Sequence, residues 1–292
     1  MSLALSPMTG AAAVPVVVLA AALLHAVWNA LAHKADDRLA VFVLMNLATT
    51  GCAAVVVCLT PLPDPRAWPY LAASAVLQVA YQALLLQAYR LGDFGQMYPI
   101  ARGTSPLLVA LVSATALGQR LSAPETLGVL VISLGLVGLA LADGLPGRAQ
   151  LPALAAALGT GVMIASYTLV DGSGVRQSPS GAAGYVAWLF LCQGPVLPLL
   201  AWALRGRSLT ARLRPVLWRG LAGGVLSLLA YGLVVWAQAH GSLATVAALR
   251  ETSIVFAALI GLVLFREPFG RRRITAGALV VTGIAVLELA HP

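Results

Sequence analysis

The stretch Met97-Tyr-Pro-Ile-Ala-Arg-Gly-Thr-Ser-Pro106 places a full positive charge inside a long apolar run. Its arginine, Arg102, lies nine residues after the polar Asp93, which is about 13 Å along a helix. A hydrocarbon core is about 30 Å thick, so the guanidinium is predicted to lie near the middle of a membrane. A charge at that depth costs about 2.5–3.5 kcal/mol on insertion scales and by default marks a functional site.

The same pattern returns as Leu249-Arg-Glu-Thr-Ser253, so the chain holds two copies of Arg-x-Thr-Ser at an offset of 148 residues (250 − 102). At this offset Ala110, Leu111 and Gly135 also meet identical residues. Self-similarity at a fixed offset predicts an internal repeat. We place the two repeats at residues 1–147 and 148–292.

The composition predicts a polytopic membrane protein. Only 10% of the 292 residues are charged and 60% are hydrophobic, whereas soluble domains carry about 25% charged residues. The apolar runs predict ten transmembrane helices, at residues 14–33, 39–59, 68–91, a run that begins after 93, 124–142, 151–170, 182–204, 216–239, 242–265 and 274–289. Five spans per repeat give the halves opposite orientations. We therefore expect an all-α fold of two five-helix inverted repeats, with a site near the midplane.

The distribution of the basic residues indicates membrane topology and does not favour nucleic-acid binding. The net charge is +8, but the Lys and Arg residues gather in the loops between apolar runs. Thirteen of them fall in odd-numbered loops and three in even-numbered loops. The positive-inside rule then predicts that the odd loops are cytoplasmic and that both termini lie outside. We expect a multi-pass protein of the inner (plasma) membrane.

Arg102 and Arg250 are the leading candidates for a site, with two interpretations open. Each arginine either contacts a substrate or pairs with a carboxylate and only strengthens helix packing. Glu251 is the only acid deep within a predicted span, and we expect it to pair with an arginine and not to carry protons. Pro99, Gly103 and Pro106 indicate either a tolerated kink or a functional break in the helix.

Other polar and aromatic residues are candidates for the same pocket. Tyr98 and Ser105 share a helical face with Arg102, and Gln78, Tyr81 and Gln82 form a stripe on another predicted span. The substrate-binding residues that we predict are Trp28, Asn29, Tyr81, Gln82, Tyr98, Arg102, Ser105, Tyr167, Tyr231, Trp236, Arg250 and Glu251. For the aromatic members the alternative role is helix core or interfacial belt.

Several motifs resemble the EamA-type transporters of the drug/metabolite transporter superfamily. They are His25-Ala-Val-Trp-Asn29, Ala88-Tyr-Arg-Leu-Gly-Asp93, Tyr98-Pro-Ile-Ala-Arg-Gly103, Ala248-Leu-Arg-Glu-Thr-Ser253 and Phe265-Arg-Glu-Pro268. The resemblance covers nearly the whole chain. It implies ten helices, a central cavity between inverted repeats and export of amino acids or other metabolites. The first repeat departs from the family in having Gln119 where the second has Glu267.

From these observations we expect a secondary transporter that exports an amino acid or another small organic acid by alternating access. Arg102 is the expected main anchor, because guanidinium binds carboxylate or phosphonate in a bidentate fork. The alternatives are an integral membrane enzyme acting on a lipid phosphate and a non-transporting scaffold or sensor. We expect no catalytic residue, cofactor or metal. The expected partners are a small-molecule substrate and membrane lipids, without nucleic acid, for a monomer or homodimer.

Overall fold

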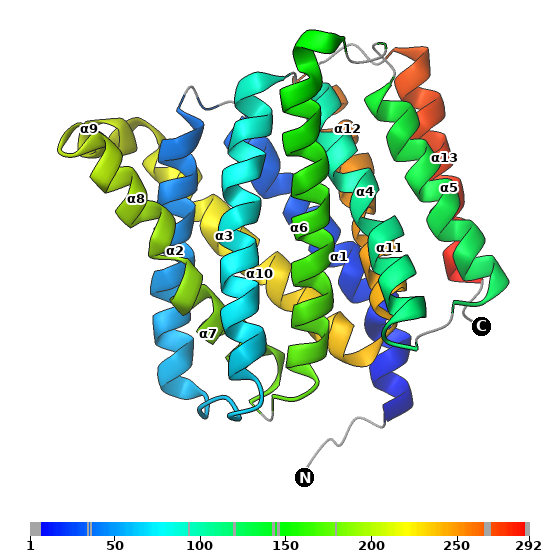
Figure 1. Cartoon of the computed structure of the whole chain (residues 1–292), viewed down its shortest axis with the longest axis horizontal. Coiled ribbons are helices and arrows are strands. Elements are labelled where there is room, and N and C mark those ends of the chain that lie inside the picture. Colours follow the sequence, from blue (N-terminus) through cyan, green and yellow to red (C-terminus); the bar gives the residue numbers. More distant parts are fainter. Residues whose placement is uncertain are drawn as a thin grey trace.

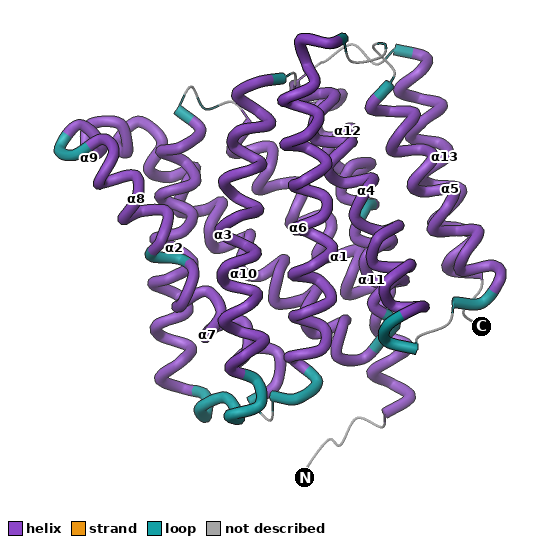
Figure 2. The backbone as a smooth tube through the Cα atoms, in the orientation of Figure 1, coloured by secondary structure: helices purple, strands orange, loops and turns teal. Residues whose placement is uncertain are grey.

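A computed structural model describes residues 7–33, 35, 37–92, 94–118, 121–141, 144, 147–178, 180–265 and 270–289. Figure 1 shows a bundle of helices that run up and down beside one another, and Figure 2 shows only helices and loops in the described residues. The helices are α1 Pro7–His33, α2 Arg38–Leu59, α3 Trp68–Leu91, α4 Phe94–Thr115, α5 Ala123–Ala140, α6 Leu151–Val175, α7 Gly181–Gln193, α8 Val196–Arg205, α9 Ser208–Leu213, α10 Leu217–His240, α11 Leu243–Arg250, α12 Thr252–Phe265 and α13 Arg271–Leu289, with 3-10 turns η1 Arg148–Gln150 and η2 Arg214–Val216.

Many of the helices are long and apolar enough to pack as membrane spans, and capping residues determine where several of them begin. Seven helical segments of the described chain are long and apolar enough to cross a membrane. Asp37 caps α2 by accepting a hydrogen bond from the Ala40 amide at 3.1 Å. Ser122 and Glu125 form a reciprocal capping box at the start of α5. The predicted all-α membrane fold is confirmed.

Several of the predicted spans differ from the observed helices, and the first begins at Pro7 instead of residue 14. The seventh divides into α7 and α8 at Gly194-Pro195, because proline cannot continue a helix through the position without losing a hydrogen bond. The ninth divides into α11 and α12 at Glu251. The sixth does not end at residue 170, because α6 continues to Val175.

The sequence left open whether the helix breaks near Pro99, Gly103 and Pro106, and the structure shows no break there. α4 runs unbroken through Pro99 and Pro106. The break lies instead between α11 and α12, in the second copy of the Arg-x-Thr-Ser pattern. The two copies therefore share a sequence pattern but not a backbone conformation.

The connections alternate between the two ends of the bundle. In Figure 1 the C-terminal ends of α1 and α5 lie at one end of the bundle, and those of α2, α4 and α6 lie at the other, where α1 begins. The helices α5 and α13 pack side by side at the edge. Gly283 allows this close approach, since a Cβ there would lie 2.8 Å from the Ile132 nitrogen and 2.9 Å from the Gly128 oxygen.

Candidate functional site

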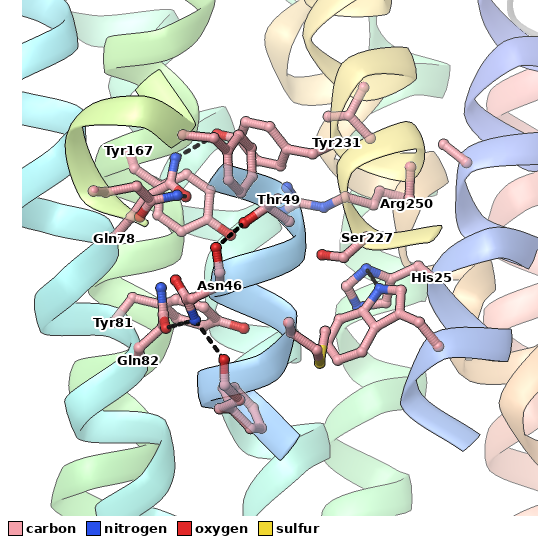
Figure 3. A pocket seen from close by; sticks show the side chains of 18 of the residues that line it. His25, Asn46, Thr49, Gln78, Tyr81, Gln82, Tyr167, Ser227, Tyr231 and Arg250 are labelled. Carbon is pink, nitrogen blue, oxygen red and sulfur yellow. Dashed lines mark hydrogen bonds between the residues drawn. The ribbon is translucent and has the colours of Figure 1, made fainter. Parts of the chain in front are cut away.

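A cavity lies at the centre of the bundle, lined from α1, α2, α3, α4, α6, α7, α10 and α11 (Figure 3). About 100 Å³ of it is free for the centres of water molecules, which is room for several waters or a small solute. Both repeats contribute to its wall. Of the residues predicted from the sequence, those that line it are Trp28, Tyr81, Gln82, Arg102, Tyr167, Tyr231 and Arg250.

The other five predicted residues do not line this cavity. Tyr98 packs against the apolar core with its ring 6.0 Å from the Arg102 guanidinium, and Ser105 is fully buried. Asn29 donates a hydrogen bond to the His25 carbonyl at 2.9 Å. Trp236 stacks on the His240 ring, 4.3 Å between ring centroids, and Glu251 lies behind the cavity wall.

Arg102 is engaged by groups from the second repeat. Its Nε lies 2.9 Å from Oε2 of Glu251, which is 0% exposed. Its Nη2 donates to Ser253 Oγ at 2.9 Å and to the Arg250 carbonyl at 3.3 Å. That carbonyl is at the C-terminal end of α11, where a helix carries partial negative charge. The packing interpretation that the sequence left open thus describes much of what Arg102 does in this structure.

Arg250 has the opposite character. It is the last residue of α11, it is 4% exposed, and its side chain is among those that line the cavity (Figure 3). Its Nε is 3.9 Å from Oε1 of Glu251, too long for a hydrogen bond. Neither its Nε nor its Nη2 has a hydrogen-bond partner in the described part of the chain.

The three side chains form a cluster of two positive charges and one negative charge. Glu251 neutralises one arginine, and its contact with Arg102 is the shorter by 1.0 Å (3.9 − 2.9). Among the described residues, one positive charge is therefore left without a counter-charge of its own beside the cavity. A buried charge without a partner is costly, so an anion in the cavity would bind strongly to the Arg250 guanidinium.

The structure adds polar lining that the sequence analysis did not single out. Asn46 donates to Gln82 Oε1 at 2.9 Å and to the Phe42 carbonyl at 2.8 Å, and so ties α2 to α3 at the cavity wall. Thr49 and His25 also line the cavity. The signal that we overlooked is Asn46 itself, an amide within an apolar run that needs a partner inside the membrane.

A second polar cluster closes one end of the cavity. We call it the floor network, and its members are Ser74, Gln78, Asp171, Tyr185, Gln193 and Tyr231. Gln78, Gln193 and Tyr231 line the cavity, whereas Ser74, Asp171 and Tyr185 lie beyond them and are 0% exposed. Glu251 is therefore not the only buried acid of the bundle. Asp171 is a second one, one turn from the end of α6.

Hydrogen bonds hold the floor network together across both repeats. The Asp171 carboxylate accepts from Tyr185 Oη at 3.0 Å, from Gln78 Nε2 at 3.3 Å and, in a very short contact, from Tyr231 Oη. Gln193 Nε2 donates to Gln78 Oε1 at 2.9 Å, and Gln78 Nε2 also lies 2.9 Å from Tyr231 Oη. The network thus joins α3 of the first repeat to α6, α7 and α10 of the second.

Comparison with known proteins identifies the family. The model of the EamA-like transporter family matches residues 12–141 and again residues 151–289. The chain belongs to the EamA-like transporter family. The two matches establish a duplicated arrangement, while our division after residue 147 stays a prediction. No curated protein matches the chain.

The fold recurs in a solved structure titled "Crystal structure of protein". The two superpose with a TM-score of 0.77 at 20% identity, over 95% of this chain and 98% of the other. This likeness concerns the fold alone. The family match makes the protein a multi-pass membrane transporter with a small-molecule substrate, and it excludes the membrane enzyme acting on a lipid phosphate.

Proposed function

We propose that this transporter moves an amino acid or another small organic acid, whose anionic group binds Arg250. The observation that carries the proposal is the buried Arg250 guanidinium, which belongs to the cavity lining and whose Nε and Nη2 have no hydrogen-bond partner among the described residues. A planar guanidinium with two free donors matches a carboxylate or phosphonate in a bidentate fork. The anchor that we assign is thus Arg250, and Arg102 keeps Glu251 and the end of α11 in place.

The rest of the lining supports a small substrate with a compact apolar or polar remainder. Tyr81 and Tyr167 contact each other edge to face, with ring centroids 5.6 Å apart, and Trp28 lies on the α1 side. Asn46 and Gln82 provide amide groups for an uncharged polar part of the ligand. Such a wall surrounds a molecule of metabolite size, and Arg102, the second cation of the lining, is already in contact with Glu251.

Alternating access of the two repeats would move this substrate across the inner (plasma) membrane. Arg102, in the first repeat, contacts Glu251 and Ser253 in the second, so the cluster joins the halves at the cavity. We infer that the direction is export, in keeping with the resemblance noted above. A midplane site between repeats is the usual position in transporters built from inverted repeats.

A ligand screen tests the substrate class. Purified protein in detergent is heated with amino acids, phosphonates, sugars or polyamines, and the midpoint of unfolding is measured. Ligands that bind the folded state raise it, so we expect shifts with carboxylates or phosphonates and none with polyamines. Stabilisation by polyamines or sugars alone would overturn the anionic assignment. Flux of the same compound into proteoliposomes then separates a transporter from a scaffold or sensor that only binds.

A further inference from the structure

The cavity floor holds a carboxylic acid that the substrate site does not use. Asp171 is fully buried on α6 and is not among the residues that line the cavity. It contacts the cavity only through Gln78 and Tyr231, which line it. A group placed there can respond to the cavity without touching the substrate.

Among the described residues, those that face Asp171 offer hydrogen-bond donors and no cation. They are Ser74 and Gln78 from α3, Tyr185 from α7 and Tyr231 from α10, with Tyr167 one turn before Asp171 on α6. From α11, the apolar Leu243 packs against the neighbouring Gly172.

The other charged and titratable groups of this region contact partners other than Asp171 or lie apart from it. Arg176, five residues further along the chain, donates to the carbonyls of Gln238 at 2.8 Å and Gly241 at 2.8 Å. Arg102 contacts Glu251, Arg250 lies at the cavity wall and makes no salt bridge with Asp171, and Tyr70 receives a hydrogen bond from Gln177 at 2.8 Å. In the described residues, then, no salt bridge neutralises the Asp171 carboxylate.

Two opposing influences act on this carboxylate. A buried charge without a counter-charge is costly, whereas the four side-chain donors around it favour the charged form. Proton binding removes the cost of the charge but converts one oxygen into an O–H donor, so one of the present donors loses its acceptor. The hydrogen bonds that join α3 to α6, α7 and α10 weaken with it, because charge-assisted bonds are about twice as strong as neutral ones.

We propose that Asp171 is a proton-binding site that couples proton movement to opening of the cavity floor. The step is association of one proton with a carboxylate oxygen, with no electron transfer and no other bond formed. Asp171 lies four residues before the end of α6, about 6 Å along the helix, so the proton has a short path from that side of the membrane. The ionised form holds the floor closed, and the protonated form releases it. This inference rests on the proposed transport function for its consequence but not for the proton site itself.

Infrared difference spectroscopy of purified protein tests the proton site without any substrate. Between alkaline and mildly acidic buffer, the wild type should gain the C=O band of a protonated carboxylic acid, and Asp171→Asn should lack it. Glu251→Gln is the matched control at the other buried acid and should keep the band. A wild type without a pH-dependent band, or a band that persists in Asp171→Asn, overturns the proposal.

A second variant covers the case in which Asp171→Asn does not fold. Tyr185→Phe removes one donor to the carboxylate and keeps the acid. Since a lost hydrogen bond disfavours the charged form, the midpoint of the infrared transition should move to higher pH. A midpoint equal to that of the wild type contradicts the assignment to Asp171.

Coupling is tested in proteoliposomes with a labelled mixture of the L-amino acids. We expect an imposed pH gradient to stimulate net wild-type flux, and Asp171→Asn to lose that stimulation while still exchanging labelled for unlabelled amino acid. Net wild-type flux that does not respond to the gradient overturns the coupling. Loss of exchange as well in a folded Asp171→Asn makes the residue part of the substrate site instead. Absence of any wild-type exchange refutes the amino-acid proposal. The proton site is then still tested by the infrared band, which requires no substrate.

Discussion

Replacing Arg250 by lysine separates the anchor from the structural arginine. Lysine keeps the charge but cannot present Nε and Nη2 together to a carboxylate. A hydrogen bond to a charged group contributes about 1.5–3 kcal/mol, and we expect Arg250→Lys to lose one of two. That loss corresponds to a roughly 10- to 100-fold weaker dissociation constant for the ligand found in the thermal screen. Stability without ligand should change little, because these two atoms have no hydrogen-bond partner in the part of the chain that the structure describes.

Arg102→Lys is the matched control, with the same chemistry at the equivalent position of the first repeat. Its guanidinium donates to Ser253 and to the Arg250 carbonyl while contacting Glu251. A lysine amine faces Glu251 but cannot reproduce this three-way arrangement. We expect the free energy of unfolding to fall by about 1.5–3 kcal/mol, the value of one hydrogen bond to a charged group.

The measurements are ligand affinity by titration calorimetry and thermal unfolding of both purified variants, with folding checked by size exclusion. The predicted pattern is a loss of affinity in Arg250→Lys and a loss of stability in Arg102→Lys. Unchanged affinity in a folded Arg250→Lys would refute the anchor. So would an Arg102→Lys protein that melts like the wild type yet loses binding to the same extent.

Three further predictions follow from separate contacts. Gly283→Val should lower the free energy of unfolding by about 1–3 kcal/mol through overpacking against the α5 backbone, whereas Gly277→Ala, with open space at its Cβ, should not destabilise in the same melting assay. Ser208→Cys, with the native cysteines replaced by serine, should resist membrane-impermeant thiol reagents in intact cells, and ready labelling would invert the topology. Burial alone would raise the pKa of Asp37, but hydrogen bonds from Arg205 and the Ala40 amide outweigh it and hold that pKa below its ordinary value. The stability that Asp37 contributes is therefore fully present at pH values above its ordinary, unfolded-state pKa. It is lost as the pH falls through the lowered pKa of the folded state. Asp37→Asn should remove this part of the acid dependence of the melting temperature, and an unchanged acid limb would contradict it.

The sequence predicted the meeting of Arg102 and Arg250 but not the division of roles between them. Both lie in the same pattern at mid-span, so hydropathy and spacing treat them alike. The difference arises from the end of α11 at Arg250, which turns a backbone carbonyl and Ser253 toward Arg102. A local chain break of this kind depends on tertiary contacts that no pattern within one helix encodes.

Asp171 was missed for a different reason. The run Asp171-Gly-Ser-Gly174 has the composition of a turn, so the predicted span ended before it. In the structure the helix continues because small residues let neighbours approach closely: a Cβ at Gly174 would lie 2.6 Å from the Tyr185 hydroxyl. These glycines are packing residues at a helix crossing, and the acid is buried in the bundle with them.

The break at Glu251 is present in only one of the two copies of the Arg-x-Thr-Ser pattern. In a symmetric dimer of separate chains, both copies would be identical by necessity, and both arginines would share one environment. Covalent fusion of the halves removes that constraint. One guanidinium, that of Arg102, can then stay paired with Glu251, while the other, that of Arg250, is available to bind the substrate as we propose. Two non-equivalent halves can therefore form one binding site for a single asymmetric ligand near the axis that relates them, whereas strictly symmetric halves would present the same groups to it from both sides.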